Sequence, residues 1–155
     1  MSESDPVMAA IVAAVEQGRA GDRPGARQAL EALWTETGDV LHRCTIAHFA
    51  ADLQDSVADE LRWDELALAE AGSMTEERIQ QYDAAWQVRQ LLPSLHLNLA
   101  DAHRRSGHPD QAEQHLDAAL AEIDSLPDND YGTLIRTGAE KIKRALADKS
   151  TAPLT

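Results

Sequence analysis

Cysteine and aromatic residues are scarce in this sequence. Cys44 is the single cysteine among 155 residues, and Phe, Trp and Tyr together make up 4%. One cysteine excludes an intramolecular disulfide framework and a zinc site of the CxxC type. Runs rich in Val, Ile, Thr and Tyr are also missing, whereas alanine and leucine dominate and favour helices. We therefore expect an all-α fold without a sheet.

Positive charge is scarce as well. The chain has 14 Lys and Arg against 27 Asp and Glu, a net charge of −13. This balance argues against nucleic-acid and anionic-membrane partners, which both require basic surfaces. No apolar run approaches the ~18 residues that span a membrane, and the acidic start Met1–Asp5 lacks the pattern of a signal peptide. We therefore expect a cytoplasmic protein.

Helix start and stop signals divide the chain into segments. Asp5-Pro6 pairs an N-cap with proline at the first helical position, and Asp39 is a second N-cap. Because proline disfavours helix at the residue before it, we expect a break at Pro93. The predicted helices cover residues 6–17, 24–37, 40–54, 57–71, a shorter one within 74–92, 94–106, 109–124 and 130–148.

Two of these helix pairs share one spacing of small and apolar residues. In residues 13–34 and 99–120, a glycine is followed by alanine five positions later, leucine four positions after that, and a small or apolar residue after three more. The matched positions are Gly21, Ala26, Leu30 and Leu33 in the first stretch and Gly107, Ala112, Leu116 and Ala119 in the second. Ala14 and Leu99-Ala100 precede them at matching positions.

This pattern resembles the tetratricopeptide repeat (TPR) family, whose ~34-residue helix–turn–helix units stack into an array. Residues 40–72 form a divergent middle unit, with Ile46-Ala47 in place but Gln54 and Asp59 where glycine and alanine are expected. The resemblance implies a TPR-like array of antiparallel helix pairs, about three repeats, with an inserted helix at about 74–92. We expect a single domain over residues 1–150 and a disordered tail at 151–155.

The last predicted helix has the composition of a terminal capping helix, with one apolar and one solvated face. Its apolar positions are Tyr131, Leu134, Ile135, Ile142 and Leu146, and its basic positions are Arg136, Lys141, Lys143 and Arg144.

In TPR proteins the concave groove commonly holds a peptide, so the resemblance implies an interaction module with a protein or peptide partner. Cys44, His48 and Asp52 are four residues apart and project from one side of their helix. The resemblance places that side in the groove. The other predicted groove residues are Leu97, Asn98, Asp101 and Arg104 or Arg105 from the third repeat and Ile11, Val15 and Arg19 from the first.

The stripe Cys44/His48/Asp52 also has a catalytic interpretation, in which His48 activates Cys44 and Asp52 orients His48. A helix interior has used its N–H groups in its own hydrogen bonds, which leaves no donors for an oxyanion hole. The chain also lacks a P-loop and a GxSxG elbow. We therefore do not expect an enzyme.

A small-molecule or metal site on the same stripe is the alternative function. His48 with Asp52, or Cys44 with His48, are ligand pairs with i, i+4 spacing. His96 or His103 would add ligands from a neighbouring helix. A third interpretation is a partly exposed polar stripe with a buried or semi-buried thiol and no ligand, and we expect no resident metal or cofactor.

Other charged and aromatic residues have simpler interpretations. His42 is expected in the core, His108 in a turn and His115 on a polar face, while Trp34, Trp63 and Trp86 are expected as core anchors. Residues 52–83 contain ten Asp and Glu against two Arg. Such a stretch is usually a solvated helix face, but it would also attract a basic partner. The basic last helix of a second copy fits that description, which would allow a head-to-tail homodimer.

Overall fold

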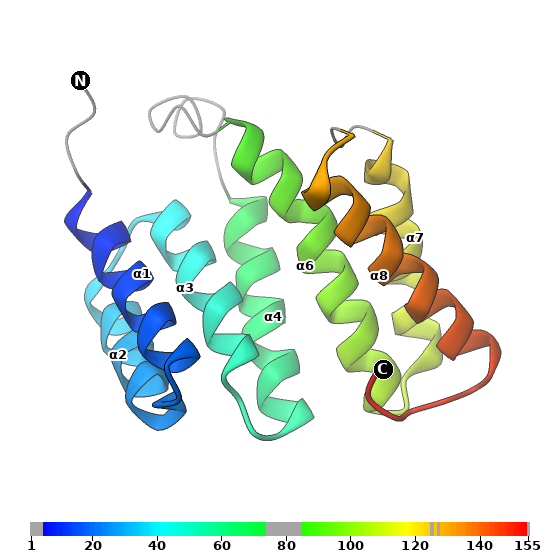
Figure 1. The fold of residues 1–155 in the computed structure, drawn as a ribbon, viewed down its shortest axis with the longest axis horizontal. Coiled ribbons are helices and arrows are strands. Elements are labelled where there is room, and N and C mark those ends of the chain that lie inside the picture. The colour runs from blue at the N-terminus through cyan, green and yellow to red at the C-terminus, as the bar shows by residue number, and fades with distance from the viewer. Residues whose placement is uncertain (1–4, 74–84, 125, 127, 155) are drawn as a thin grey trace. The chain divides into compact units, whose positions relative to one another are not determined.

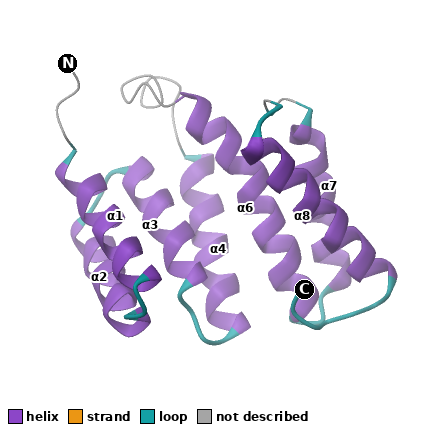
Figure 2. Ribbon diagram, viewed as in Figure 1, coloured by secondary structure: helices purple, strands orange, loops and turns teal. Residues whose placement is uncertain are grey.

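The structure is a computed structural model that describes residues 5–73, 85–124, 126 and 128–154, with the side chains of 85–91 outside that description. These residues form seven α-helices joined by loops and contain no strand (Figures 1 and 2). The all-α prediction is confirmed. Within the described residues, no helix has the length and apolar character needed to cross a membrane.

Two compact units divide the chain, Met1–Arg78 and Ile79–Thr155. The first contains α1 (Pro6–Arg19), α2 (Arg23–Glu36), α3 (Val40–Asp52) and α4 (Val57–Gly72). The second contains α6 (Ala85–Arg105), α7 (Pro109–Ile123) and α8 (Asp130–Ala147). The single domain over residues 1–150 stays a prediction.

Side-chain caps fix the starts of several helices. The Asp5 carboxylate accepts hydrogen bonds from the backbone N–H groups of Val7 and Met8 at 3.0 and 3.1 Å. The Asp39 carboxylate accepts from Leu41 and His42 in the same way. These caps satisfy N–H groups that have no partner inside the helix. They confirm the two helix starts predicted from the N-cap residues.

The predicted break at Pro93 is wrong, because α6 continues through this residue. A proline inside a helix removes one backbone hydrogen bond and costs about 3 kcal/mol. Here the ring is fully buried, so the apolar contacts of the ring offset part of that cost. The shorter helix predicted within 74–92 falls partly on residues 74–84, which lie outside the described part of the chain.

In the first unit the small residues of the repeat pattern lie inside. Ala14 of α1 and Ala26 of α2 are both buried, and α1 packs against α2 and α3. Gly18 lies where α1 comes close to α2, because a Cβ atom there would be 3.2 Å from the Ala26 Cβ. The absence of side-chain bulk therefore lets α1 and α2 approach each other.

Two tryptophans and an arginine join α2, α3 and α4. The Trp34 and Trp63 rings meet edge to face with centroids 5.3 Å apart. The Arg43 guanidinium lies 3.6 Å from the centroid of the Trp34 ring and donates to the Glu70 carboxylate at 3.0 Å. It also donates to the carbonyls of Trp34 and Thr37 where α2 ends, a position that favours a cation.

Trp63 is buried and Trp34 is half-buried, so both serve as the predicted core anchors. The side chain of Trp86 lies outside the described residues.

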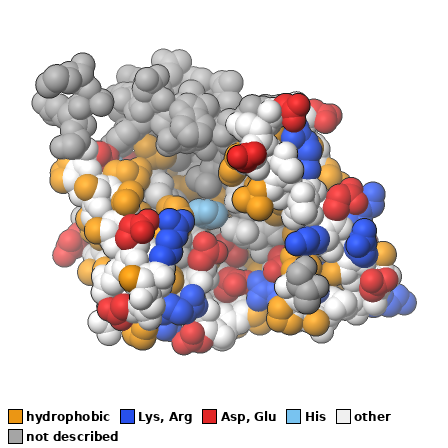
Figure 3. Space-filling model, in the orientation of Figure 1, with side chains coloured by type: hydrophobic (Ala, Val, Ile, Leu, Met, Phe, Trp, Pro, Cys, Tyr) orange, Lys and Arg blue, Asp and Glu red, His pale blue; other side chains and the backbone are white. Residues whose placement is uncertain are grey.

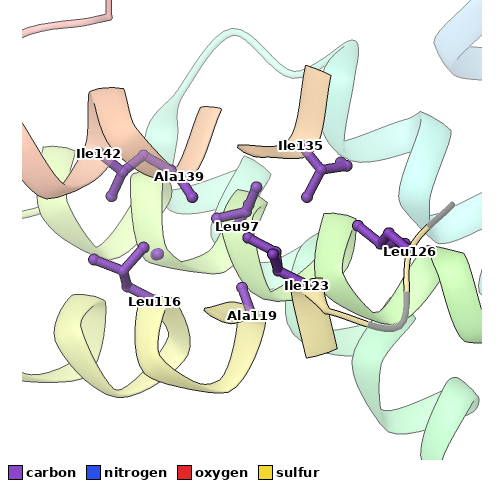
Figure 4. Packing of buried hydrophobic residues seen from close by; sticks show 9 residues of the cluster. Leu97, Leu116, Ala119, Ile123, Leu126, Ile135, Ala139 and Ile142 are labelled. Atoms are coloured by element: carbon purple, nitrogen blue, oxygen red, sulfur yellow. The ribbon is translucent and has the colours of Figure 1, made fainter. Parts of the chain in front are cut away.

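In the second unit α8 covers the hairpin made by α6 and α7. Ile135, Ala139 and Ile142 of α8 pack against Leu97 of α6 and Leu116 of α7 (Figure 4). Leu134 was predicted on this apolar face but is 67% exposed. It is ~100° from its neighbour Ile135 on the helix and therefore points out of the stripe.

Candidate functional site

Cys44 lies in the interior of the first unit. It is fully buried, and its thiol donates to the carbonyl oxygen of Ala67 in α4 at 3.4 Å. Burial, and secondarily the negative charge of Glu70, raises the pKa of the thiol to about 12. This placement differs from the prediction that Cys44 faces a groove and agrees with the interpretation of a stripe whose thiol is buried.

The reason is that α3 is covered on more than one side, since it packs against α1, α2 and α4. Its buried residues therefore do not form a single stripe but lie around the helix: Leu41, His42, Cys44, Ile46, Ala47, Ala50 and Ala51. A helix that is enclosed in this way has no wholly polar face. The spacing of Cys44, His48 and Asp52 alone does not identify the side of α3 that reaches solvent.

His48 is half-buried, with its ring centroid 5.2 Å from that of Phe49. Burial lowers the pKa of His48 to about 4, so the imidazole is neutral at pH 7. His48 therefore offers no positive charge at physiological pH.

Asp52, at the end of α3, lies in a pocket of about 230 Å³ on the first unit. The walls are formed by Val15, Gly18 and Arg19 of α1, Arg23 of α2, and Phe49, Asp52 and Leu53 at the end of α3. Arg23 donates to the backbone carbonyl of Asp52 at 3.4 Å. Burial raises the pKa of the Asp52 carboxyl, and the charge of Arg23 opposes that rise.

The pocket brings together three of the predicted groove residues, Val15 and Arg19 from the first helix pair and Asp52 from the second. Ile11, predicted beside Val15, is fully buried instead. Phe49, Leu53 and Arg23 were not predicted as site residues. Leu53 is itself buried, and only the packing of α1 against α3 shows that it and Phe49 border an opening.

In the second unit, Asp101 and Arg104 hold each other and the end of the chain. Arg104 is 2% exposed, donates to Asp101 Oδ1 at 2.7 Å and donates to the carbonyl of Ser150 at 2.8 Å. Arg105 donates to Asp101 Oδ2 at 2.8 Å. These contacts use Arg104 inside the unit, contrary to its predicted exposure in a groove. Asn98, also predicted there, is half-buried on α6.

The predicted metal ligands do not assemble. Among the described residues, no group of three or more His, Cys, Asp or Glu side chains is placed to hold a metal ion. The Cys44/His48/Asp52 stripe therefore does not form such a group. His96 and His103, proposed as extra ligands, contact other histidines of their own unit.

Four histidines form a continuous chain of rings in the α6–α7 hairpin. His96 Nδ1 lies 3.1 Å from His115 Nδ1, and His103 Nδ1 lies 3.3 Å from His108 Nδ1. The His103 and His115 rings are stacked, with centroids 5.5 Å apart and planes at 6°. Burial lowers the pKa values of His96 and His115, and the charge of Glu122 raises that of His96.

Sequence reasoning missed this cluster by treating the four histidines one at a time. The pairs His96–His115 and His103–His108 share one midpoint in the sequence, between Arg105 and Ser106, where α6 ends. In an antiparallel helix hairpin, residue pairs that share a midpoint lie across from each other at successive levels of the two helices. This symmetry was the signal available in the sequence.

The acidic stretch at 52–83 is divided among different environments. Asp55 pairs with Arg27 at 3.3 Å, Glu70 pairs with Arg43, and Asp64 is buried. Glu76, Glu77 and Asp83 lie outside the described residues. On the face seen in Figure 3, acidic and basic side chains are interspersed.

Comparison of the chain with protein-family models, with curated proteins and with solved structures finds no match.

Proposed function

We propose that this protein is an interaction module that binds a peptide or protein segment on its helical surface, with the pocket of the first unit as the contact site. The observation that carries this proposal is the meeting of Val15, Arg19 and Asp52 around one opening of about 230 Å³. Those residues belong to the sides of two helices that the TPR resemblance assigns to a groove. An opening of this size accommodates one side chain of a partner rather than a whole cofactor.

The arrangement of helices supports a TPR-like array as the scaffold. Short turns join α1 to α2, α3 to α4 and α6 to α7, and α8 covers the last hairpin. The alanines at the matched positions, Ala14, Ala26, Ala100 and Ala112, are all buried. Small residues at these points allow the two helices of a hairpin to pack closely, as the repeat requires.

The pocket walls define the chemistry of the partner. Phe49 and Leu53 supply apolar surface, while Arg19 and Arg23 supply two guanidinium groups against the single carboxylate of Asp52. A segment with an apolar side chain next to a carboxylate complements these walls, because arginine binds carboxylates through charge-assisted hydrogen bonds. Extended peptides commonly bind through such a combination of one pocket and flanking polar contacts.

The test is a selection of random peptides displayed on phage against the full chain, followed by affinity measurements on the enriched peptides. We expect Arg19→Ala and Phe49→Ala to weaken binding at least tenfold. Arg27→Ala is the matched control, because Arg27 lies on α2 outside the pocket walls and pairs with Asp55. Failure to enrich any peptide, or equal affinity for Arg19→Ala and the parent protein, would contradict the proposal.

No observation favours the alternative site on Cys44, His48 and Asp52. The thiol is enclosed and hydrogen-bonded to Ala67, and its raised pKa disfavours the thiolate that a metal would need. The head-to-tail homodimer stays a prediction.

A further inference from the structure

The second unit contains a feature that peptide binding does not use, the histidine cluster of the α6–α7 hairpin. His96 and His103 are seven residues apart on α6 and share one face of that helix. His115 of α7 stacks on both rings, with centroid distances of 5.4 and 5.5 Å. Imidazoles in contact cannot all be positively charged at once, because adjacent positive charges repel.

The geometry of the His96–His115 pair is close to that of two ligands on one ion. The Nδ1 atoms of His96 and His115 are 3.1 Å apart. Two imidazole nitrogens that bind one zinc ion at about 2.0–2.1 Å in a tetrahedral arrangement lie about 3.3 Å from each other. The observed separation of the two Nδ1 atoms is therefore within a few tenths of an ångström of the separation that a shared ion requires.

Charge distinguishes the His96–His115 pair from the His103–His108 pair. His108 is the N-cap of α7, and the positive end of a helix dipole disfavours a cation there. His96 and His115 lie along the helices, away from that end. Glu122, two turns after His115, acts electrostatically on His96 and offsets part of the charge of a bound cation.

We propose that His96 and His115 bind one divalent transition-metal ion of the zinc class through their Nδ1 atoms, with water in the remaining coordination positions. Imidazole nitrogen is a preferred ligand for such ions, whereas Mg²⁺ and Ca²⁺ require oxygen. Without the ion, the Nδ1–H group of one ring donates a hydrogen bond to the Nδ1 atom of the other ring. Binding moves that proton to Nε2 of the same ring, so both rings remain neutral and both Nδ1 lone pairs face the ion.

The experiment is a calorimetric titration of zinc chloride into the untagged full chain at pH 7.5, with magnesium chloride in parallel. We expect one Zn²⁺ per chain and no heat from Mg²⁺. His96→Gln and His115→Gln should each weaken Zn²⁺ binding at least tenfold. Loss of a residue that only hydrogen-bonds to a metal ligand already lowers metal affinity roughly 10–100-fold, and loss of the ligand itself costs no less. His108→Gln is the matched control, because it removes one ring of the neighbouring pair and should leave the affinity unchanged.

Imidazole ¹⁵N NMR of the unsubstituted protein gives a second readout that does not depend on how a variant folds. Zn²⁺ should shift the Nδ1 resonances of His96 and His115 and leave those of His42 and His48 in place. The proposal is overturned by an absence of heat and of shifts, by shifts confined to other histidines, or by equal weakening in His108→Gln.

Discussion

The Arg104 guanidinium on α6 donates to the backbone carbonyl of Ser150 at 2.8 Å, across 46 residues of chain. The same side chain donates to Asp101, so one buried group joins α6 to the segment that follows α8. A buried guanidinium is tolerated only when its donors are satisfied. Asp101 and Arg104 therefore act together to hold the end of the second unit.

Replacement of Arg104 by Met removes these donors while keeping much of the apolar volume. We expect the free energy of unfolding to fall by about 2–4 kcal/mol, because Asp101 and the Ser150 carbonyl lose a charge-assisted partner. Urea denaturation measures this change. Arg105→Met is the control, because Arg105 is more exposed and donates to the other oxygen of Asp101; we expect a loss below about 1 kcal/mol. Equal losses in the two variants would show that the Ser150 contact contributes nothing.

Lys149 is the residue before Ser150 and has a φ of 55°, in the left-handed region. It ends α8 in the position that glycine usually takes, with Ser150 N–H donating to the Ala145 carbonyl at 2.9 Å. Lys149→Gly should raise the free energy of unfolding by about 1 kcal/mol, because a Cβ atom is disfavoured at this φ. Asp148→Gly, at a φ of −82°, should give no gain in the same thermal denaturation experiment. A gain of equal size at Asp148 would refute this explanation.

The thiol of Cys44 should be unreactive while the first unit is folded. Its pKa of about 12 lies above the ordinary value of 9.0, and only the thiolate attacks a disulfide reagent. With Ellman's reagent at pH 8, we expect no reaction in buffer and complete reaction in denaturant. The raised pKa also means that this group stabilises the folded state below pH 9 and that the contribution is lost as the pH rises towards 12. Rapid labelling of the native protein would contradict the enclosed position of Cys44.

His48 should make the first unit less stable in acid. Its pKa in the folded state is lowered from 6.5 to about 4, so the unfolded chain binds a proton at a pH where the folded chain does not. The contribution of His48 is present above pH 6.5 and is lost as the pH falls towards 4. His96 and His115 contribute in the same direction, so the measurement is the difference in acid sensitivity between the parent protein and His48→Gln. Identical pH profiles would refute the prediction, and NMR titration of His48 measures its pKa directly.

The parts of the fold that were predictable depend on short-range chemistry. Asp5 and Asp39 cap helices because their carboxylates reach N–H groups two and three residues away. Ala26 and Ala112 hold the same position in a spacing that recurs in two hairpins, and both are buried. Each of these features is set by neighbours within one or two helices, which the sequence displays directly.

The site depended on contacts that are distant in sequence. Cys44 is enclosed because α4 packs on its side of α3, and Arg104 is enclosed because Ser150 returns to α6. Helical periodicity gives the angle between two side chains on one helix but does not identify the neighbour on each side. The histidine pairs are intermediate, because hairpin symmetry relates His96 to His115 once the turn is located.

Gly18 should not tolerate a methyl group, although alanine normally favours a helix over glycine by about 1 kcal/mol. A Cβ atom at Gly18 would lie 3.1 Å from Leu53 Cδ2 and 3.2 Å from Ala26 Cβ. Leu53 can rotate away, but the Ala26 Cβ moves only with α2 itself. We expect Gly18→Ala to lower the free energy of unfolding by about 1–2 kcal/mol, because overpacking outweighs helix propensity. Gly72→Ala, where nothing lies within 4 Å, is the matched control and should stabilise α4 slightly. Stabilisation by both substitutions in thermal denaturation would mean that α1 and α2 do not approach closely at Gly18.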